Sequence, residues 1–370
     1  MDEKTLKMLA MKSMSAMLSV VIFSLVFTRY NNVIIYANEN STVVNGEIRI
    51  GQNKEDLGND VYVDVETGMV VDNIHGIHLV INKAAGGEQQ QLSLEDFYML
   101  RQIKVSISGL QDKVIAKQDV IFGGTGSDPL LDVSVSYEYN PNTFLYTAVC
   151  QLQLDDVYAY RVLEDKQNYY IELRKPHEVY EKVIVVDAGH GGNDVGAYTK
   201  DMSHYEKNVN FSIQSYLKEM LGQEDIKVYY TRLGDEKVYL NPRVDLANAV
   251  NADMFISIHC NSSDYSSPKG SEVLYSTKIQ EKAAISSERL ATILLDNLVQ
   301  EAGLDKRGVV NGDDIYIISK SQVPVALIEV GFISNKEDLN FLKEEENHRL
   351  IAEGIYKGIL CAYEEIEAAE

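Results

Sequence analysis

The sequence predicts an α/β fold for the C-terminal half, with a wound, mixed or largely parallel sheet between flanking helices, and a smaller β-rich domain before it. Three short apolar runs, at residues 183–186, 254–258 and 325–328, are rich in β-branched side chains. Such runs are typical of strands that are buried on both faces of a parallel sheet. Because helical segments separate them, the pattern predicts alternating strands and helices.

The other elements of this half follow from apolar periodicity and from helix start signals. A helix is expected at 206–221, where Val209, Ile213 and Leu217 share one face. Asn241 and Pro242 mark the start of another helix. The further expected elements are strands at 226–231, 271–275 and 315–318, and helices at 240–250, 283–302 and 348–365.

The segment 38–175 is expected to form the β-rich domain, because several of its apolar runs alternate and turn-forming residues separate them. Lys175-Pro176-His177 marks its end, and the α/β domain is expected to span 182–370. The first 37 residues are expected to be a signal peptide, cleaved after Ala37, or an uncleaved signal anchor. Lysines precede an apolar stretch at 14–27 that is shorter than the roughly 20 residues of a membrane span. The protein is therefore expected to be exported.

Composition excludes one class of partner. The 370 residues carry a formal net charge of −22, which argues against nucleic-acid binding because phosphate contacts need a basic face. The three cysteines show no paired spacing, and a Cys150–Cys361 disulfide stays open. Cys260 is expected to pack in the core, because strand alternation turns it away from the face of His259.

Residues with metal chemistry follow the three apolar runs. His190 follows the first run, His259 ends the second and Glu329 ends the third, while Glu206 opens the next helix. Ligands of open α/β sheets bind at the carboxyl ends of the strands. A single histidine there is more often a satisfied polar residue than a ligand, but three such coincidences predict one site. Two imidazoles, a carboxylate and a second glutamate are the residues of a catalytic zinc hydrolase.

These residues lie in sequence motifs that carry a family resemblance. The segment from Lys182 to Tyr363 resembles the zinc-dependent N-acetylmuramoyl-L-alanine amidases of bacterial cell walls, the amidase type 3 family. The motifs include VVDAGHGGNDVGA, EKNVN, FISIHCNS, RGV and IEVGFISN, in this order along the chain. The resemblance covers about the C-terminal half of the chain.

The resemblance implies a role for each motif residue. His190, Glu206 and His259 would hold Zn²⁺, and Glu329 would be the catalytic glutamate that moves the proton. Asn261 and Arg307 are substrate-binding candidates. His204 is a rival ligand, although the family pattern favours Glu206, and Arg243 is expected to be structural.

The implied activity is hydrolysis of the amide between N-acetylmuramic acid and L-alanine in peptidoglycan by a zinc-activated water. The protein would act outside the cell, in the wall or at the outer face of the membrane, with attachment through its N-terminal segment left open. Exported members often carry a β domain that binds wall or envelope, so targeting is one role for 38–175 and a spacer is another. Two alternatives remain: another zinc peptidase, such as a carboxypeptidase or aminopeptidase, and a wall-binding protein without a metal.

Overall fold

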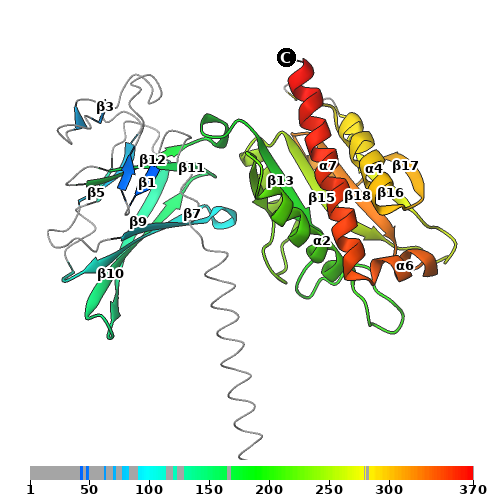
Figure 1. Cartoon of the computed structure of the whole chain (residues 1–370), viewed down its shortest axis with the longest axis horizontal. Coiled ribbons are helices and arrows are strands. Elements are labelled where there is room, and N and C mark those ends of the chain that lie inside the picture. Colours follow the sequence, from blue (N-terminus) through cyan, green and yellow to red (C-terminus); the bar gives the residue numbers. More distant parts are fainter. Residues whose placement is uncertain are drawn as a thin grey trace, which may run out of the picture. The chain divides into compact units, whose positions relative to one another are not determined.

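The computed structural model describes residues 91–113, 129–164, 168–278, 280 and 283–369, together with the backbone of short strands between 42 and 82 and at 120–122. The chain divides into two compact units (Figure 1). The first reaches Asp155 and includes Arg161–Leu173, and the second consists of Asp156–Tyr160 and Arg174–Glu370. The predicted signal peptide or anchor, residues 1–37, lies outside the described residues.

The first unit is built from strands, as the sequence predicted. One sheet has the order β6-β7-β10-β9, with β6 at Gln91–Phe97, β7 at Gln102–Leu110, β10 at Leu145–Leu154 and β9 at Leu130–Asn140, and its neighbours are antiparallel. Another has the order β11-β12-β5-β8, with β11 at Ala159–Glu164, β12 at Asn168–Arg174, β5 at Ile77–Asn82 and β8 at Val120–Phe122. Two strand pairs, β1 (Thr42–Val44) with β2 (Glu47–Arg49) and β3 (Tyr62–Val63) with β4 (Val70–Val71), complete the described strands. Ile103, Val105 and Ile107 occupy every second position of β7 and are fully buried. This two-residue spacing is typical of a sheet that is covered on one face.

A six-stranded mixed sheet forms the centre of the second unit, which confirms the predicted fold class. Its order is β14-β13-β15-β18-β16-β17. The strands are β13 (Val183–Ala188), β14 (Lys227–Tyr230), β15 (Met254–Asn261), β16 (Ser271–Tyr275), β17 (Lys306–Asn311) and β18 (Val325–Phe332). Only the β16–β18 pair is antiparallel. All six residues of β13 are buried, as expected for a strand covered on both faces.

Two groups of helices cover this sheet. Helices α2 (Glu206–Leu221), α4 (Ser287–Ala302) and α7 (Glu345–Ala369) cover one face of the strands, and α7 packs against both α2 and α4 (Figure 1). Helices α3 (Leu240–Ala249) and α5 (Tyr316–Lys320) pack against each other and contact β13 and β18 respectively. Cys260 is buried in the core that α2, α4 and α7 share with the strands, which confirms its predicted packing role.

Several elements of the structure differ from those expected. The strand predicted at 315–318 is wrong: these residues begin α5, because a short buried apolar run does not distinguish a strand from a helix. Strand β17 was not predicted, because it is a largely exposed edge strand without an apolar run. Helix α4 begins at Ser287 and not at 283, because the Ser286 hydroxyl caps it by accepting from the Arg289 N–H. The short helices α6 (Lys336–Leu342), η1 (Tyr98–Leu100) and η3 (Pro176–Glu178) were also not predicted.

Two further observations concern the cysteines and the helices. All three cysteines are free thiols, with Cys150 and Cys260 buried and Cys361 exposed. Within the described part of the chain, none of the helices combines the length and the apolar character that a membrane crossing needs.

The division of the chain makes a prediction about folding. We expect a fragment of residues 174–370 to fold alone, because it keeps the whole six-stranded sheet and its covering helices. A fragment of 182–370 should be less stable by about 1 kcal/mol, because it loses the 2.8 Å hydrogen bond between His177 Nε2 and the Asn251 carbonyl. Urea unfolding of both fragments checks this, and two equal midpoints would contradict the contribution of His177.

Candidate active site

Three side chains with metal-ligating atoms converge at the carboxyl ends of β13 and β15. His190 lies in the loop after β13, Glu206 is the first residue of α2 and His259 lies near the end of β15. Their ligating atoms all lie within 4.8 Å of one another. Glu206 Oε1 is 3.2 Å from His190 Nε2 and 2.8 Å from His259 Nδ1. The three residues therefore form one compact group that could hold a metal ion.

Two glycines make this approach possible. A Cβ atom at Gly189 would lie 2.2 Å from the ring of His259, and one at Gly196 would lie 2.4 Å from Glu206 Oε2. Gly196 also has a φ of +65°, which disfavours any side chain. His190 itself has a φ of +64°, so this histidine adopts a conformation that costs free energy and that its surroundings must impose.

Glu206 is held in place by backbone groups. Its side chain is nearly inaccessible, with Oε1 accepting from the Cys260 N–H at 3.0 Å and Oε2 from the Ala197 N–H at 2.7 Å. Burial by itself would raise the pKa of Glu206. The hydrogen bonds and charges of His190 and His259 instead hold this pKa well below its usual range. Glu206 is therefore an anion whose position is fixed from both sides.

The two histidines are oriented by carboxylates. His190 Nδ1 lies 2.9 Å from Asp194 Oδ1, so the other ring nitrogen points at Glu206. Burial would lower the pKa of His190, but Glu206 and then Asp194 raise it to about 9. The pKa of His259 is also raised, because Glu206 outweighs the effect of burial. Both imidazoles would have to lose these protons to ligate a metal ion, because only a neutral imidazole nitrogen can coordinate one.

Glu329 lies beside this group and differs from Glu206 in its hydrogen bonding. It is the direct register neighbour of His259 on the adjacent strand β18. Its Oε2 atom is buried and has no hydrogen-bond partner in the described part of the chain. Burial raises the pKa of Glu329 to about 7. Buried polar atoms are usually satisfied, so this orphaned oxygen points to a function.

Comparison with known proteins identifies the family. The family described as N-acetylmuramoyl-L-alanine amidase matches residues 184–361. The chain is 34% identical over 184 residues to the uncharacterised protein YqiI of Bacillus subtilis, a match that covers 50% of this chain and 86% of YqiI. It is 31% identical to the germination-specific N-acetylmuramoyl-L-alanine amidase of the same organism, covering 50% of this chain and 81% of that protein. The chain belongs to the N-acetylmuramoyl-L-alanine amidase family.

The match is confined to one part of the chain. The N-acetylmuramoyl-L-alanine amidase LytC of B. subtilis is 34% identical over 192 residues, which are 52% of this chain and only 37% of LytC. The residues that match the family model, 184–361, all belong to the α/β unit.

Buried charged side chains beneath the active site form hydrogen bonds to the loop that carries His190. Asp187, which is fully buried, accepts hydrogen bonds from Arg243, Thr231 and Ser257. Arg243 also donates to the carbonyls of Ala188 and His190 at 3.0 and 2.8 Å. Burial would raise the pKa of Asp187, but Arg243 and the two hydroxyls lower it below its usual range. Arg243 therefore has the structural role that the sequence predicted.

A second buried arginine supports the same loop. Arg232 has 1% of its surface exposed and donates to four backbone carbonyls, those of Ala188, Gly189, Lys207 and Gly234. Burial lowers its pKa to about 10. Sequence reasoning did not indicate this role of Arg232, because carbonyl acceptors leave no trace in side-chain patterns.

The two predicted substrate-binding residues share a partner that the sequence did not single out. Asn261 Nδ2 donates to Glu272 Oε1 at 2.8 Å, and Arg307 Nε donates to Glu272 Oε2 at 2.7 Å. Glu272 was missed because it lies within a strand, with no strand-end signal. The rival ligand His204 lies outside the metal group, and its Nδ1 is 2.7 Å from the Ser203 hydroxyl.

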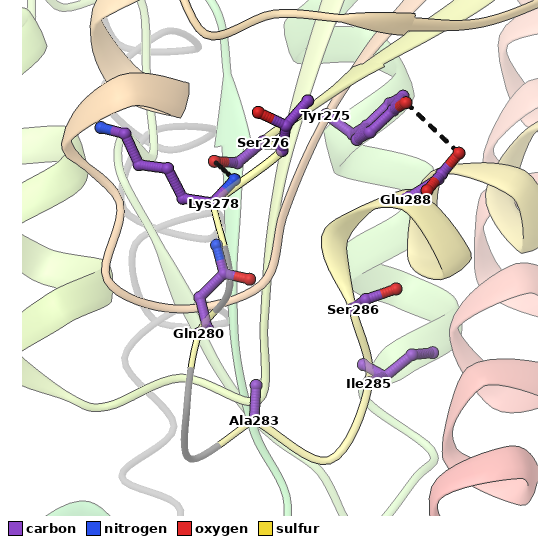
Figure 2. Close-up of a pocket in the computed structure, with 9 residues that line it drawn as sticks. Tyr275, Ser276, Lys278, Gln280, Ala283, Ile285, Ser286 and Glu288 are labelled. Atoms are coloured by element: carbon purple, nitrogen blue, oxygen red, sulfur yellow. Dashed lines mark hydrogen bonds between the residues drawn. The ribbon is translucent and has the colours of Figure 1, made fainter.

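A pocket of about 340 Å³ lies away from these residues. It is formed at the end of β16, where Tyr275 contacts Glu288 at the start of α4, and Lys278 and Gln280 line another wall (Figure 2). Because β16 runs antiparallel to β18, this end of the strand lies at the opposite edge of the sheet from Glu329. The metal group contributes no residue to this pocket.

The glycine contacts give a prediction. Gly196→Ala should destabilise the protein by about 2 kcal/mol or more, because the new Cβ meets Glu206 and the positive φ disfavours alanine. Gly234→Ala is the matched control, because its Cβ would meet nothing closer than 3.9 Å. Thermal denaturation of the two variants measures the difference. Equal losses in both variants would mean that the Glu206 contact is not tight.

Proposed function

We propose that the protein is a zinc-dependent amidase that cleaves the bond between N-acetylmuramic acid and L-alanine in peptidoglycan. The observation that carries this proposal is Glu329, a buried carboxyl with an orphaned oxygen, next to the His190, Glu206 and His259 group. A metal group and an adjacent proton carrier are one established arrangement for amide hydrolysis by an activated water. Family membership supports the choice of bond.

The residues present fit a zinc ion. Two imidazole nitrogens and one carboxylate oxygen are the donor set of catalytic zinc sites, which keep a fourth position open. Asp194 would orient His190 as a ligand, as outer carboxylates commonly do. Zinc, when bound, supplies a Lewis acid that polarises the substrate carbonyl and lowers the pKa of a nearby water.

The chain's own residues would carry the proton. Glu329 takes a proton from the attacking water and delivers it to the nitrogen of the L-alanine leaving group. A pKa of about 7 suits both steps, because a group near the working pH can accept and then donate. The orphaned Oε2 leaves an acceptor atom available for that water.

Exposed aromatic rings on three loops are consistent with a large polymeric substrate. Tyr198, Tyr239 and Tyr265 are each at least half exposed, and they lie on the loops after β13, β14 and β15. In parallel strands these loops leave the same edge of the sheet, which is the edge of the metal group. Aromatic rings at that edge offer flat apolar surfaces to a glycan strand. We propose that the protein acts on wall polymer outside the cell, with residues 38–175 serving as a targeting domain or a spacer.

The products of the reaction test this function against the peptidase alternative. Incubation of the zinc-loaded protein with purified peptidoglycan should release new free amino groups on L-alanine, measured by amine labelling and mass spectrometry. A carboxypeptidase would instead release the last residue of the stem peptide. A wall-binding protein would sediment with the wall and release neither product.

Metal content tests the ligand group. We expect about one zinc per chain by elemental analysis, and a His190→Ala, His259→Ala double variant should lose it. His204→Ala is the control and should keep its zinc, because His204 lies outside the group. Full zinc content in the double variant would rule out these ligands.

Turnover tests Glu329. Glu329→Gln should keep zinc and fold but lose about 10²–10⁴-fold in kcat, because an amide cannot accept the proton. Glu344→Gln, which changes an exposed carboxylate, should leave kcat unchanged. Near wild-type turnover in Glu329→Gln would reject Glu329 as the base.

A further inference from the structure

Three acidic or metal-binding side chains form a row across adjacent strands. Glu329 on β18 is the register neighbour of His259 on β15 and of Glu272 on β16. Residues directly opposite one another in a sheet project from the same face. Glu272 therefore lies on the same face as the metal group, one strand beyond Glu329.

Arg307 extends this row to the fourth strand. The register between β16 and β17 shifts between Ser271 and Glu272, and Arg307 occupies this irregular place on β17. The Nε atom of its guanidinium donates to Glu272 Oε2 at 2.7 Å. The row thus reads His259, Glu329, Glu272 and Arg307, with a single arginine at its outer end.

Glu272 cannot act as a second proton acceptor in this arrangement. Its Oε2 accepts from Arg307, and its Oε1 accepts from Asn261 at 2.8 Å. Both oxygens are therefore engaged, in contrast to the orphaned oxygen of Glu329. The role left for Glu272 is to hold Arg307 and Asn261 in fixed positions.

Arg307 is fixed and still accessible. Its guanidinium carbon lies 5.0 Å from the centre of the Phe332 ring, its Nη1 lies 3.4 Å from the Lys269 carbonyl, and 39% of its side chain is exposed. Its Nη2 atom has no hydrogen-bond partner among the residues that the structure describes. A planar guanidinium with unused N–H donors suits a carboxylate, which it binds with charge-assisted hydrogen bonds.

We propose that Arg307 binds a carboxylate on the peptide stem of the substrate and that Glu272 is the residue that positions it. The proposal rests on the proposed amidase function and adds a substrate preference to it. The stem residue after L-alanine is a γ-linked D-glutamate, whose α-carboxyl group is either free or amidated. The enzyme should therefore prefer stems with the free carboxylate.

Two substrates that differ only at this group provide the test. They are N-acetylmuramoyl-L-alanyl-D-glutamate and its D-isoglutamine counterpart, assayed with the zinc-loaded full chain. We expect kcat/KM to be about 10–100-fold higher for the acid, in line with a hydrogen bond to a charged group. Arg307→Gln should remove that advantage mainly through KM, with little change for the amide. Arg307→Lys should recover part of this advantage, because lysine keeps the positive charge but lacks the planar guanidinium that binds a carboxylate through two N–H groups.

Glu272→Gln tests the positioning role. It should raise KM for the acid and leave zinc content unchanged, because it weakens the hold on Arg307 without touching the metal group. Arg289→Gln is the matched control: Arg289 is an exposed arginine that pairs with Glu365 between α4 and α7, and its loss should not alter the preference. An unchanged KM in Glu272→Gln would contradict the positioning role.

The proposal and the amidase function fail in different ways. Equal kcat/KM values for the two substrates in the wild type, or an unchanged preference in Arg307→Gln, would overturn the role of Arg307 alone. If neither substrate is cleaved, the amidase function fails. Binding of L-alanyl-D-glutamate and L-alanyl-D-isoglutamine, measured by calorimetry, then decides on Arg307. Preference for the acid that is lost in Arg307→Gln supports the carboxylate site, and equal binding overturns it.

Discussion

The rest of the site depends on the ion pair and hydrogen bonds that the buried Asp187 carboxylate makes. A carboxylate without solvent is costly unless it is paired and hydrogen-bonded. Asp187 meets that requirement with Arg243 from α3, Thr231 after β14 and Ser257 on β15. These contacts connect β13, β15, the residue that follows β14 and helix α3, and they lie next to the loop that carries His190. Removal of Arg243 alone would therefore leave an unpaired charge in the core, and the loop that carries His190 would lose its support.

The two buried arginines explain how a strained loop persists. His190 has a positive φ, which an isolated chain would avoid. Arg243 holds the carbonyl of His190, and Arg232 holds that of Gly189, so the backbone on both sides of the strained residue is fixed. Glu329 shows the opposite arrangement, since its buried Oε2 has no partner in the described residues. The site thus combines a fully satisfied support with one unsatisfied carboxyl, and chemistry is expected at the unsatisfied group.

Three glutamate side chains in this region differ in their electrostatic environment. Glu206 is an anion between two histidines, Glu329 has a pKa near neutrality, and Glu272 is neutralised by Arg307. Three carboxyl groups in one neighbourhood thereby take three different electrostatic roles. Burial and hydrogen bonding decide which role each has, because the residue type is the same in all three.

The sequence by itself determined the buried strands, the wound sheet and the residues at the strand ends. These are local properties: β-branched runs mark strands such as β13, and strand-end residues such as His259 meet at one edge because parallel strands point the same way. Only the tertiary structure decided the rest. The edge strand β17 carries no apolar run, α5 begins in a run that also suited a strand, and Glu272 acquires its partners from β15 and β17. Those contacts join residues that are distant in sequence, so no local sequence pattern predicts them. The backbone carbonyls that accept from Arg232 are unpredictable for the same reason.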